Sequence, residues 1–331
     1  MFPETPPTIK SHEQESTLER WLSLELKNQY ESKAKILNQL GIISPMPRTW
    51  IDENNETQID GTDVKMRILG IDGQTYDLPR MEEIKTAILE NKEMFEKKMK
   101  QGFTDLNIIP FAMPLDQLIK TMERTLIKHH KEGKLFTLKK NIDDENEKLE
   151  PLELGSEPVN KWEGYDNADT EGKIVYYPKK FIRDNHQGQT KKEILEKTKK
   201  GFIVTFNEKN PNIPKENQNE IIGERKRLEA NKASNDYLEM LQTEAQYQNE
   251  QGQIPEEWIA KFLTTLEKYN QVIDGYRGNG KASFQLGAYF PFSGNVPNAY
   301  WFRAGRRANF GRYDPEYRNG DYGARSSVRV L

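Results

Sequence analysis

The residues with the clearest chemical potential lie in the last fifty positions, 282–331. This segment holds seven arginines, three acidic residues, no lysine and 11 of the chain's 33 aromatic residues. Arginines beside aromatic rings can neutralise and stack on single-stranded nucleic acid. Tyrosine with glycine and asparagine also suits adaptable protein-binding loops, because tyrosine offers a large contact area at low entropic cost. A purely structural role is expected for roughly half of these residues, above all Trp301, Tyr289 and Phe290.

Net charge separates this tail from the rest of the chain. The 331 residues carry a formal charge of −3, whereas seven arginines against three acids give the tail +4, so the first 281 residues carry −7. The chain is polar, with 31% charged and 35% hydrophobic residues, but its 10% aromatic residues are enough to build a core. Composition therefore predicts a folded protein with a chemically distinct C-terminal segment.

Composition also restricts the chemistry open to the chain. It contains no cysteine, which excludes disulfides, thiolate metal sites and cysteine nucleophiles. His12, the pair His129-His130 and His186 are not spaced as metal ligands on one helical face, so we expect neither a metal nor a cofactor. Gly278-Asn279-Gly280 lacks the glycine and lysine of a phosphate-binding loop, and no serine lies in a nucleophile-elbow pattern. The protein is therefore not expected to be an enzyme.

The order of residues in the tail resembles a known pattern. Arg306-x-Ala308 is followed by Arg312-x-Asp314-Pro315-x-x-Arg318, then by Gly323-x-Arg325 and Val328-Arg329-Val330. This order resembles the C-terminal pattern of the formylglycine-generating-enzyme-like branch of the C-type lectin fold. Within that branch it looks most like the variable proteins of diversity-generating retroelements. The resemblance is closest over residues 298–330, is looser over 282–331, and does not cover the first 150 residues.

Two features depart from that family. Two residues more than usual separate the last glycine-arginine pair from Leu331. The catalytic members of the branch use cysteines, or a histidine cluster that binds iron, and this chain has neither. The chain thus resembles a fold relative without the family's chemistry, since a fold alone implies no catalysis.

The resemblance implies a division of labour within the tail. In such proteins an error-prone reverse transcriptase rewrites chosen codons on a fixed framework of glycine and arginine. The implied hypervariable ligand-binding surface consists of Asn298, Tyr300, Phe302, Asn309, Phe310, Tyr313, Tyr317 and Asp321. The implied framework consists of Arg306, Arg312, Arg318, Gly323 and Arg325, whose guanidinium groups would hold loop carbonyls and acids such as Asp314.

The predicted function is ligand binding by this diversified C-terminal surface, with an unknown protein as the ligand. The alternative is a protein that binds single-stranded nucleic acid through the same arginines and aromatic rings. A third hypothesis is a degenerate enzyme with an unfamiliar site. Salt separates the first two, because contacts to phosphate weaken steeply as salt rises and a tyrosine-centred interface depends on it much less.

The helices and strands predicted along the chain, which must position the tail, indicate an α+β fold. The resemblance implies a C-type lectin-like domain within it. Residues 1–45 contain an amphipathic helix over 11–40, with leucines at helical spacing before Gly41. A mixed α/β region over 46–140 and an acidic loop or linker over 141–172 follow. The lectin-like domain spans 173–331, with its variable region over about 298–330.

Local signals predict individual elements within these regions. They indicate a break over 44–47 and two strands, 64–69 and 71–76, around the turn signal Asp72-Gly73. Helices are predicted over 79–100, from 114 onward, over 191–199 and over 254–269, and residues 221–250 are predicted to be mostly helical. Strands are predicted over 173–177, 201–206, 288–290, 300–302 and 327–330, the last of which would tie down the end of the tail.

The sequence also allows predictions about membrane association and localisation. No apolar run approaches the ~20 residues that a membrane helix needs, so membrane insertion is not expected. The N-terminus lacks the basic and apolar segments of a signal peptide, which leaves the localisation open and favours the cytoplasm. The oligomeric state is not predicted.

Overall fold

The last strand of the chain lies inside a sheet built from distant segments. The computed structural model describes residues 17–140, 144, 146–278 and 280–331. Within this part, a four-stranded sheet has the order β11 (Gln251–Gly252), β19 (Ser326–Arg329), β8 (Ile203–Glu208) and β4 (Phe103–Ile109). Strand β19 is antiparallel to both of its neighbours. The predicted terminal strand is therefore confirmed, as is the predicted strand over 201–206.

A second, six-stranded sheet carries the tail. Its order in the described residues is β18-β14-β16-β17-β6, and β13 also pairs with β16. Strands β16 and β17 form an antiparallel hairpin, and the predicted strand over 300–302 is the end of β16. The bounds are β6 Val159–Lys161, β13 Gly275–Tyr276, β14 Ala282–Phe284, β16 Val296–Phe302, β17 Arg307–Tyr313 and β18 Tyr322–Ala324.

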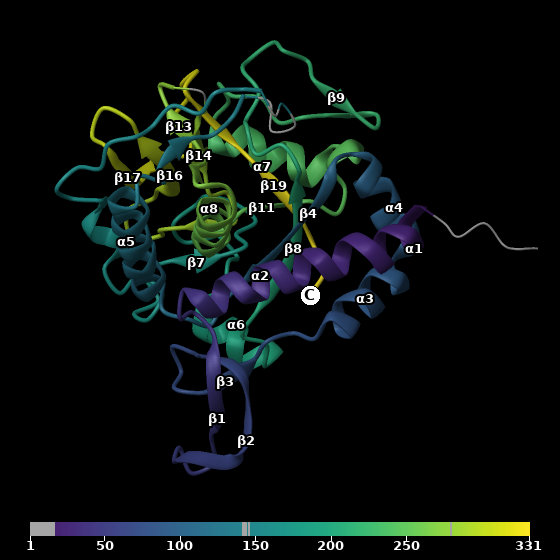
Figure 1. The fold of residues 1–331 in the computed structure, drawn as a ribbon, viewed down its shortest axis with the longest axis vertical. Coiled ribbons are helices and arrows are strands. Elements are labelled where there is room, and N and C mark those ends of the chain that lie inside the picture. The colour runs from purple at the N-terminus through teal and green to yellow at the C-terminus, as the bar shows by residue number, and fades with distance from the viewer. Residues whose placement is uncertain (1–16, 141–143, 145, 279) are drawn as a thin grey trace, which may run out of the picture.

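Helix α8 (Pro255–Tyr269) lies between the two sheets and is seen end-on in the centre of Figure 1. It begins as predicted, with proline at the first position and two acidic residues in the first turn. Its side chains are buried from Pro255 to Leu266. On one side the Trp258 ring packs against Phe310 of β17, and on the other Asn107 of β4 donates a hydrogen bond to the helix backbone. The helix therefore joins both sheets into one core.

The N-terminal helix is confirmed where the structure describes it. Helix α1 (Thr17–Trp21), the π-helical turn η1 (Leu22–Leu26) and α2 (Lys27–Gln39) follow one another without a break. Leucines at helical spacing face the core, and Gly41 follows the helix with φ +68°, a conformation that glycine adopts readily. Residues 11–16 of the predicted helix lie outside the described residues.

Next along the chain, a three-stranded arm projects from the body (Figure 1). It consists of β1 (Ser44–Ile51), β2 (Thr57–Leu69) and β3 (Thr75–Asp77), and the β2–β3 hairpin turns at the predicted Asp72-Gly73. The predicted break over 44–47 is wrong, because β1 begins at Ser44. Its two prolines are compatible with a strand because β1 lies at the edge of the sheet, where a missing N–H removes no necessary bond.

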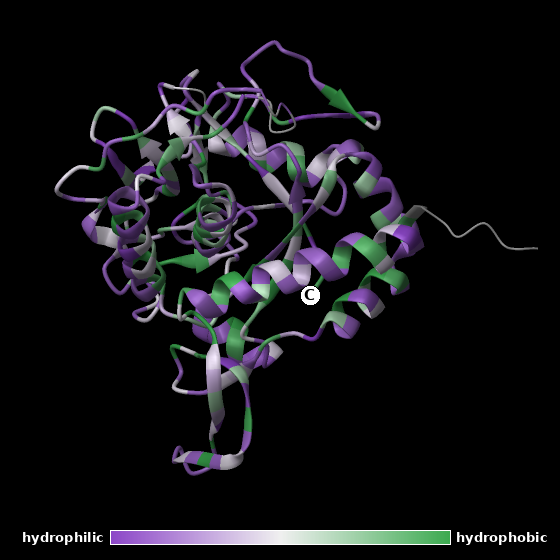
Figure 2. Ribbon diagram, viewed as in Figure 1, coloured by the Kyte–Doolittle hydropathy of each residue, from purple (hydrophilic) through white to green (hydrophobic). Residues whose placement is uncertain are grey.

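The predicted helix over 79–100 is two helices, α3 (Met81–Glu90) and α4 (Lys92–Lys100). Asn91 interrupts them with φ −123° and ψ 37°, outside the helical region. The helix predicted from residue 114 is confirmed as α5 (Leu115–Lys131). Helices α1 to α4 carry both hydrophilic and hydrophobic residues along their length (Figure 2), as expected for helices that cover a core.

The segment 141–172 is not a linker over its second half. Strand β6 pairs in parallel with β17 of the tail, and Tyr165 in the 3-10 turn η2 (Glu163–Tyr165) is fully buried against Phe310 and Phe290. One hydrophobic cluster draws residues from Leu18 to Val328. The predicted regions 46–140 and 173–331 therefore share a core as well as the four-stranded sheet.

The middle of the chain is less helical than predicted. Of the residues 221–250, only α7 (Ser234–Thr243) and the short turn η3 (Ala245–Tyr247) are helical, because left-handed residues and a glycine at 223 interrupt the rest. The helix predicted over 191–199 is confirmed as α6 (Lys191–Thr198). Short strands complete this part: β5 Phe136–Thr137, β7 Val175–Tyr176, β9 Ile221–Ile222, β10 Arg225–Lys226, β12 Gln271–Val272 and β15 Ala288–Tyr289. The architecture is thus α+β, as predicted.

Candidate functional site

The hairpin β16–β17 sorts the predicted site residues between two faces of the six-stranded sheet. Successive side chains of a strand point to opposite faces, so Asn298, Tyr300 and Phe302 share one face. Their partners across the ladder are Gly311, Asn309 and Arg307, which lie on the same face. Aromatic residues dominate this face. We call it the aromatic face, formed by Tyr276, Asn298, Tyr300, Phe302, Asn309, Tyr313, Tyr317 and Tyr322.

Tyr322 is the centre of the aromatic face. Its ring is buried, and its centroid lies 5.1 Å from that of Tyr313, 5.6 Å from Tyr317 and 6.1 Å from Tyr300, each in an edge-to-face arrangement. Its hydroxyl donates to the Tyr313 hydroxyl over 3.4 Å. Burial, together with the neighbouring tyrosines, raises the pKa of Tyr322, so its hydroxyl stays protonated. The partly exposed rings around it therefore pack against a buried aromatic ring.

Part of this face is covered by the protein itself. Helix α7 contributes Tyr237, Leu238 and Leu241 to the same hydrophobic cluster as Phe284, Val296 and Tyr322. Tyr300, Tyr313 and Tyr317 border this cluster and remain partly exposed, as do Phe302 and Asn309. The open part of the aromatic face is therefore a patch of rings beside a packed helix.

Two predicted contact residues are not on an accessible surface. Phe310 alternates with Asn309 and so points to the other face, where it is fully buried and packs on Trp258 and Tyr165. Asn298 is on the aromatic face but 0% exposed, opposite Gly311. Among the described residues, neither polar atom of the Asn298 side chain has a hydrogen-bond partner. The prediction that these two residues contact a ligand is therefore wrong for this conformation.

The polar residues at the margins of the aromatic face form hydrogen bonds within the protein. The Asn309 side-chain oxygen accepts a hydrogen bond of 2.6 Å from Asn160 of β6, whose contribution the sequence analysis missed. Asp321 is half-buried and accepts from Lys281 over 3.0 Å. Tyr276 was also missed, because its place depends on parallel pairing of β13 with β16, which leaves no local signal in the sequence.

The predicted framework residues have different roles. The buried Arg325 donates to the Pro211 carbonyl over 2.7 Å and pairs with Asp274, which also accepts from the Trp258 indole. Gly323 lies where an added Cβ would be 2.5 Å from Ile213 Cγ2. Both positions hold the tail to the body through contacts that other residue types would not reproduce.

The other three framework arginines are exposed, and none holds Asp314. Arg312 stacks over the Trp162 ring at 4.0 Å, and Arg318 pairs with Glu216 at 3.4 Å. Arg306 has φ +53°, and its backbone carbonyl accepts from the amide of Gly155. Asp314 instead accepts from the amide of Glu316 in a turn of its own. The prediction that framework guanidiniums hold loop carbonyls and acids is therefore met by Arg325 and Arg318, but Asp314 is not among the acids that they hold.

Three arginines near the aromatic face pair with acids. Arg303 pairs with Glu150 at 2.7 Å, Arg307 pairs with Glu157, and Arg318 pairs with Glu216. Each acid comes from a segment at least 100 residues earlier in the chain. Phosphate groups would have to displace these carboxylates, which weakens the case for nucleic acid.

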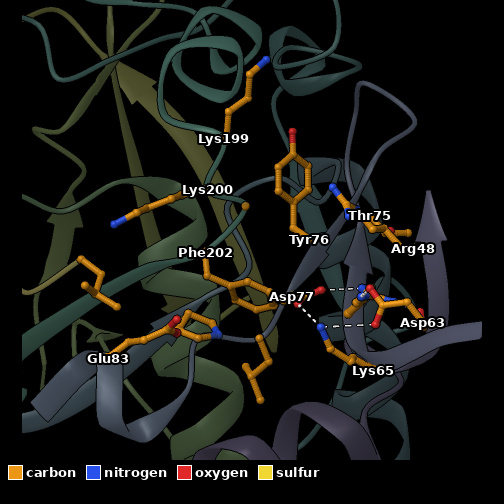
Figure 3. Close-up of a pocket in the computed structure, with 15 residues that line it drawn as sticks. Arg48, Asp63, Lys65, Thr75, Tyr76, Asp77, Glu83, Lys199, Lys200 and Phe202 are labelled. Atoms are coloured by element: carbon orange, nitrogen blue, oxygen red, sulfur yellow. Dashed lines mark hydrogen bonds and ion pairs between the residues drawn. The ribbon is translucent and has the colours of Figure 1, made fainter. Parts of the chain in front are cut away.

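A cavity of about 500 Å³ lies elsewhere, between the base of the arm and the segment 199–202. Figure 3 shows Lys65 between Asp63 and Asp77, at 3.2 and 3.4 Å. The buried Arg67 also pairs with both carboxylates. These four charged groups thus pair with one another, and none of the tail residues predicted as site residues is among the described residues that line the cavity.

In the described part of the chain, no helix is long and apolar enough to cross a membrane. The same residues contain no group of three or more histidine or acidic side chains that could hold a metal ion. Comparison with models of known protein families, with curated proteins and with solved structures gives no significant match.

Proposed function

We propose that the protein binds a protein ligand through the open part of the aromatic face. The observation that carries this proposal is the arrangement of Tyr300, Tyr313 and Tyr317, partly exposed around the buried ring of Tyr322. Rigid tyrosines supply contact area with little entropy to lose on binding. The neutralised arginines at the margins favour a protein ligand over a phosphate backbone.

We further propose that this surface is diversified by a retroelement and that its frame is a C-type lectin-like domain of the formylglycine-generating-enzyme-like branch. The order of glycines and arginines in the tail supports this proposal, as does the placement of the tail, whose strands β14, β16, β17 and β18 lie in the six-stranded sheet while β19 lies inside the four-stranded sheet. Accessible side chains can change without disturbing the core, whereas Gly323 and the buried Phe310 cannot. Diversification should therefore follow exposure.

The genome of the source tests the diversification. We expect, close to this gene, a reverse-transcriptase gene and a noncoding near-copy of the DNA for residues 298–330. Mismatches should fall at adenines of the near-copy, in codons for accessible residues such as Tyr300, Tyr313 and Tyr317. Codons for Gly323 and Phe310 should agree. A complete genome without a near-copy, or mismatches spread over all four bases, would contradict the proposal.

A second experiment tests the class of ligand. The full chain is titrated with a fluorescent single-stranded oligothymidine at low and at moderate salt. We expect no binding, or only weak binding that a Tyr313→Ala variant retains, because three arginines at the margins already pair with acids. Tight binding that falls steeply with salt and is lost in Tyr313→Ala would replace the protein ligand with single-stranded nucleic acid.

A further inference from the structure

A second cavity of about 500 Å³ lies where the N-terminal helix meets α8 and β4, and it contains none of the aromatic-face residues. Of the described residues that line it, the charged ones are Lys33, Lys209, Lys261, Lys268, Glu25 and Asp105. Four ammonium groups thus face two carboxylates. A recess in which charges of one sign predominate concentrates counter-ions of the opposite sign.

Two of these lysines are buried and share one carboxylate. Lys33 and Lys261 are 7% and 5% exposed, respectively. The Lys33 ammonium lies 3.4 Å from one oxygen of Asp105, and the Lys261 ammonium pairs with the other. Lys33 also donates to the Thr264 hydroxyl over 3.2 Å. Asp105 is thus the carboxylate that ion-pairs with both buried ammonium groups, while the buried carboxylates of Glu257 and Asp274 act on Lys261 from farther away. Two buried cations that share one ion-pair partner are less well compensated than a one-to-one pair.

The pKa values of Asp105 and Lys33 reflect the sharing of one carboxylate by two buried lysines. Burial works against the charged form of Asp105, but Lys261 and Lys33 lower its pKa to about 2, so it is ionised at neutral pH. Burial lowers the pKa of Lys33, and the charges of Lys261 and Lys268 add to this against the attraction of Asp105. Both pKa shifts are expected. Asp105 faces two cations, which favour its ionised form, whereas Lys33 faces one anion and further cations, which disfavour its charged form.

We propose that this cavity binds a small phosphate-bearing ligand, whose anionic group lies beside Lys33 and Lys261. A phosphate fits because it carries more negative charge than a single carboxylate and the described cations of the wall are all lysines, which bind phosphate as point charges. The exposed Lys268 and Tyr269 form part of the rim.

The other cavities lack this combination. In the cavity of Figure 3 the buried cation, Arg67, already has two carboxylates. A third cavity, beside α7, is lined by four acidic and three basic described residues. A pair of buried lysines that share one ion-pair partner therefore distinguishes the cavity beside α8.

Calorimetric titration of the full chain with sodium pyrophosphate tests the proposal. We expect binding at low salt and a rise of Tm with ligand concentration, because a ligand that binds only the folded state stabilises it. Lys33→Met should abolish binding. The same variant should be no less stable than the parent without ligand, since it leaves Lys261 and Asp105 as a one-to-one pair.

Two exposed positions provide a matched comparison that does not depend on a buried substitution. Lys268→Gln at the rim should weaken pyrophosphate binding roughly tenfold, as expected for the loss of one charge-assisted contact. Lys97→Gln on α4 makes the same charge change away from the cavity and should bind like the parent. Absence of binding in the parent, or equal weakening by both substitutions, would overturn the proposal. Tighter binding of succinate than of pyrophosphate would overturn the assignment to phosphate.

Discussion

Tyr313 and Tyr317 stack face to face, with ring centroids 3.9 Å apart and planes within 7° of parallel. Tyr313 ends strand β17, and Tyr317 follows in a turn closed by a hydrogen bond from its amide to the Asp314 carbonyl. Both rings meet the edge of Tyr322. The turn therefore brings two tyrosines of the proposed binding surface into one unit with a buried anchor.

A double-mutant cycle on Tyr313 and Tyr317 measures the coupling energy between the two stacked rings. Exposed side chains usually contribute little to stability, but stacked rings should couple by about 1 kcal/mol. We expect Tyr313→Ala and Tyr317→Ala each to destabilise the protein, and the double variant to lose less than the sum of the two. Urea unfolding of the four proteins gives the coupling. Strict additivity would show that the stack contributes nothing.

Trp301 is expected to be a core residue in stability measurements. It is 1% exposed, and among the described residues its indole N–H has no hydrogen-bond partner. Trp301→Ala should destabilise the protein by about 3–5 kcal/mol, as large core truncations do. Trp301→Phe removes the unpartnered N–H and keeps most of the ring, so it should cost clearly less. An equal loss for both variants in urea unfolding would mean that the indole N–H has a partner after all.

Glycines of the tail can be compared pairwise. Gly323→Ala would place a Cβ 2.5 Å from Ile213 and 3.3 Å from the Ala230 backbone, so we expect a loss of about 1–3 kcal/mol from overpacking. Gly320→Ala meets no described heavy atom within 4 Å and should change stability by less than about 0.5 kcal/mol. Thermal unfolding of both variants checks this difference. Equal shifts would remove Gly323 from the framework.

Glu257 should make stability depend on pH. Burial raises its pKa above the ordinary value of 4.5, although hydrogen bonds from Thr205, Asn207 and Ser327 work in the opposite direction. The contribution of Glu257 to the free energy of unfolding is most favourable at a pH below that ordinary pKa, where the carboxyl group is protonated in the folded and the unfolded state. This contribution is lost as the pH rises through the pKa of the folded state.

The variant Glu257→Gln removes this dependence. A glutamine keeps an acceptor for Thr205 and Asn207 without a buried charge. We expect its advantage in unfolding free energy over the parent to be absent near pH 4.5 and to grow toward pH 8. A parent that is the more stable of the two at pH 8 would mean that the ionised carboxylate is stabilised in place.

Local sequence signals predicted the elements that depend least on contacts between distant segments of the chain. Proline with two acids in the first turn placed the start of α8, Asp72-Gly73 placed the β2–β3 turn, and the period of the leucines placed the N-terminal helix. These signals work because caps, turns and helical faces depend on neighbours a few residues away. The tail was likewise recognised as a distinct segment from composition alone.

Tertiary structure decided which face of each element is buried and which distant residues meet. Alternation already places Asn309 and Phe310 on opposite faces, but only the position of α8 makes the face of Phe310 the core. Lys33 and Lys261 meet Asp105 from 72 and 156 residues away along the chain, a pairing with no local pattern. Hydrogen bonding and burial between distant segments depend on the whole packed arrangement, which no short window of sequence encodes.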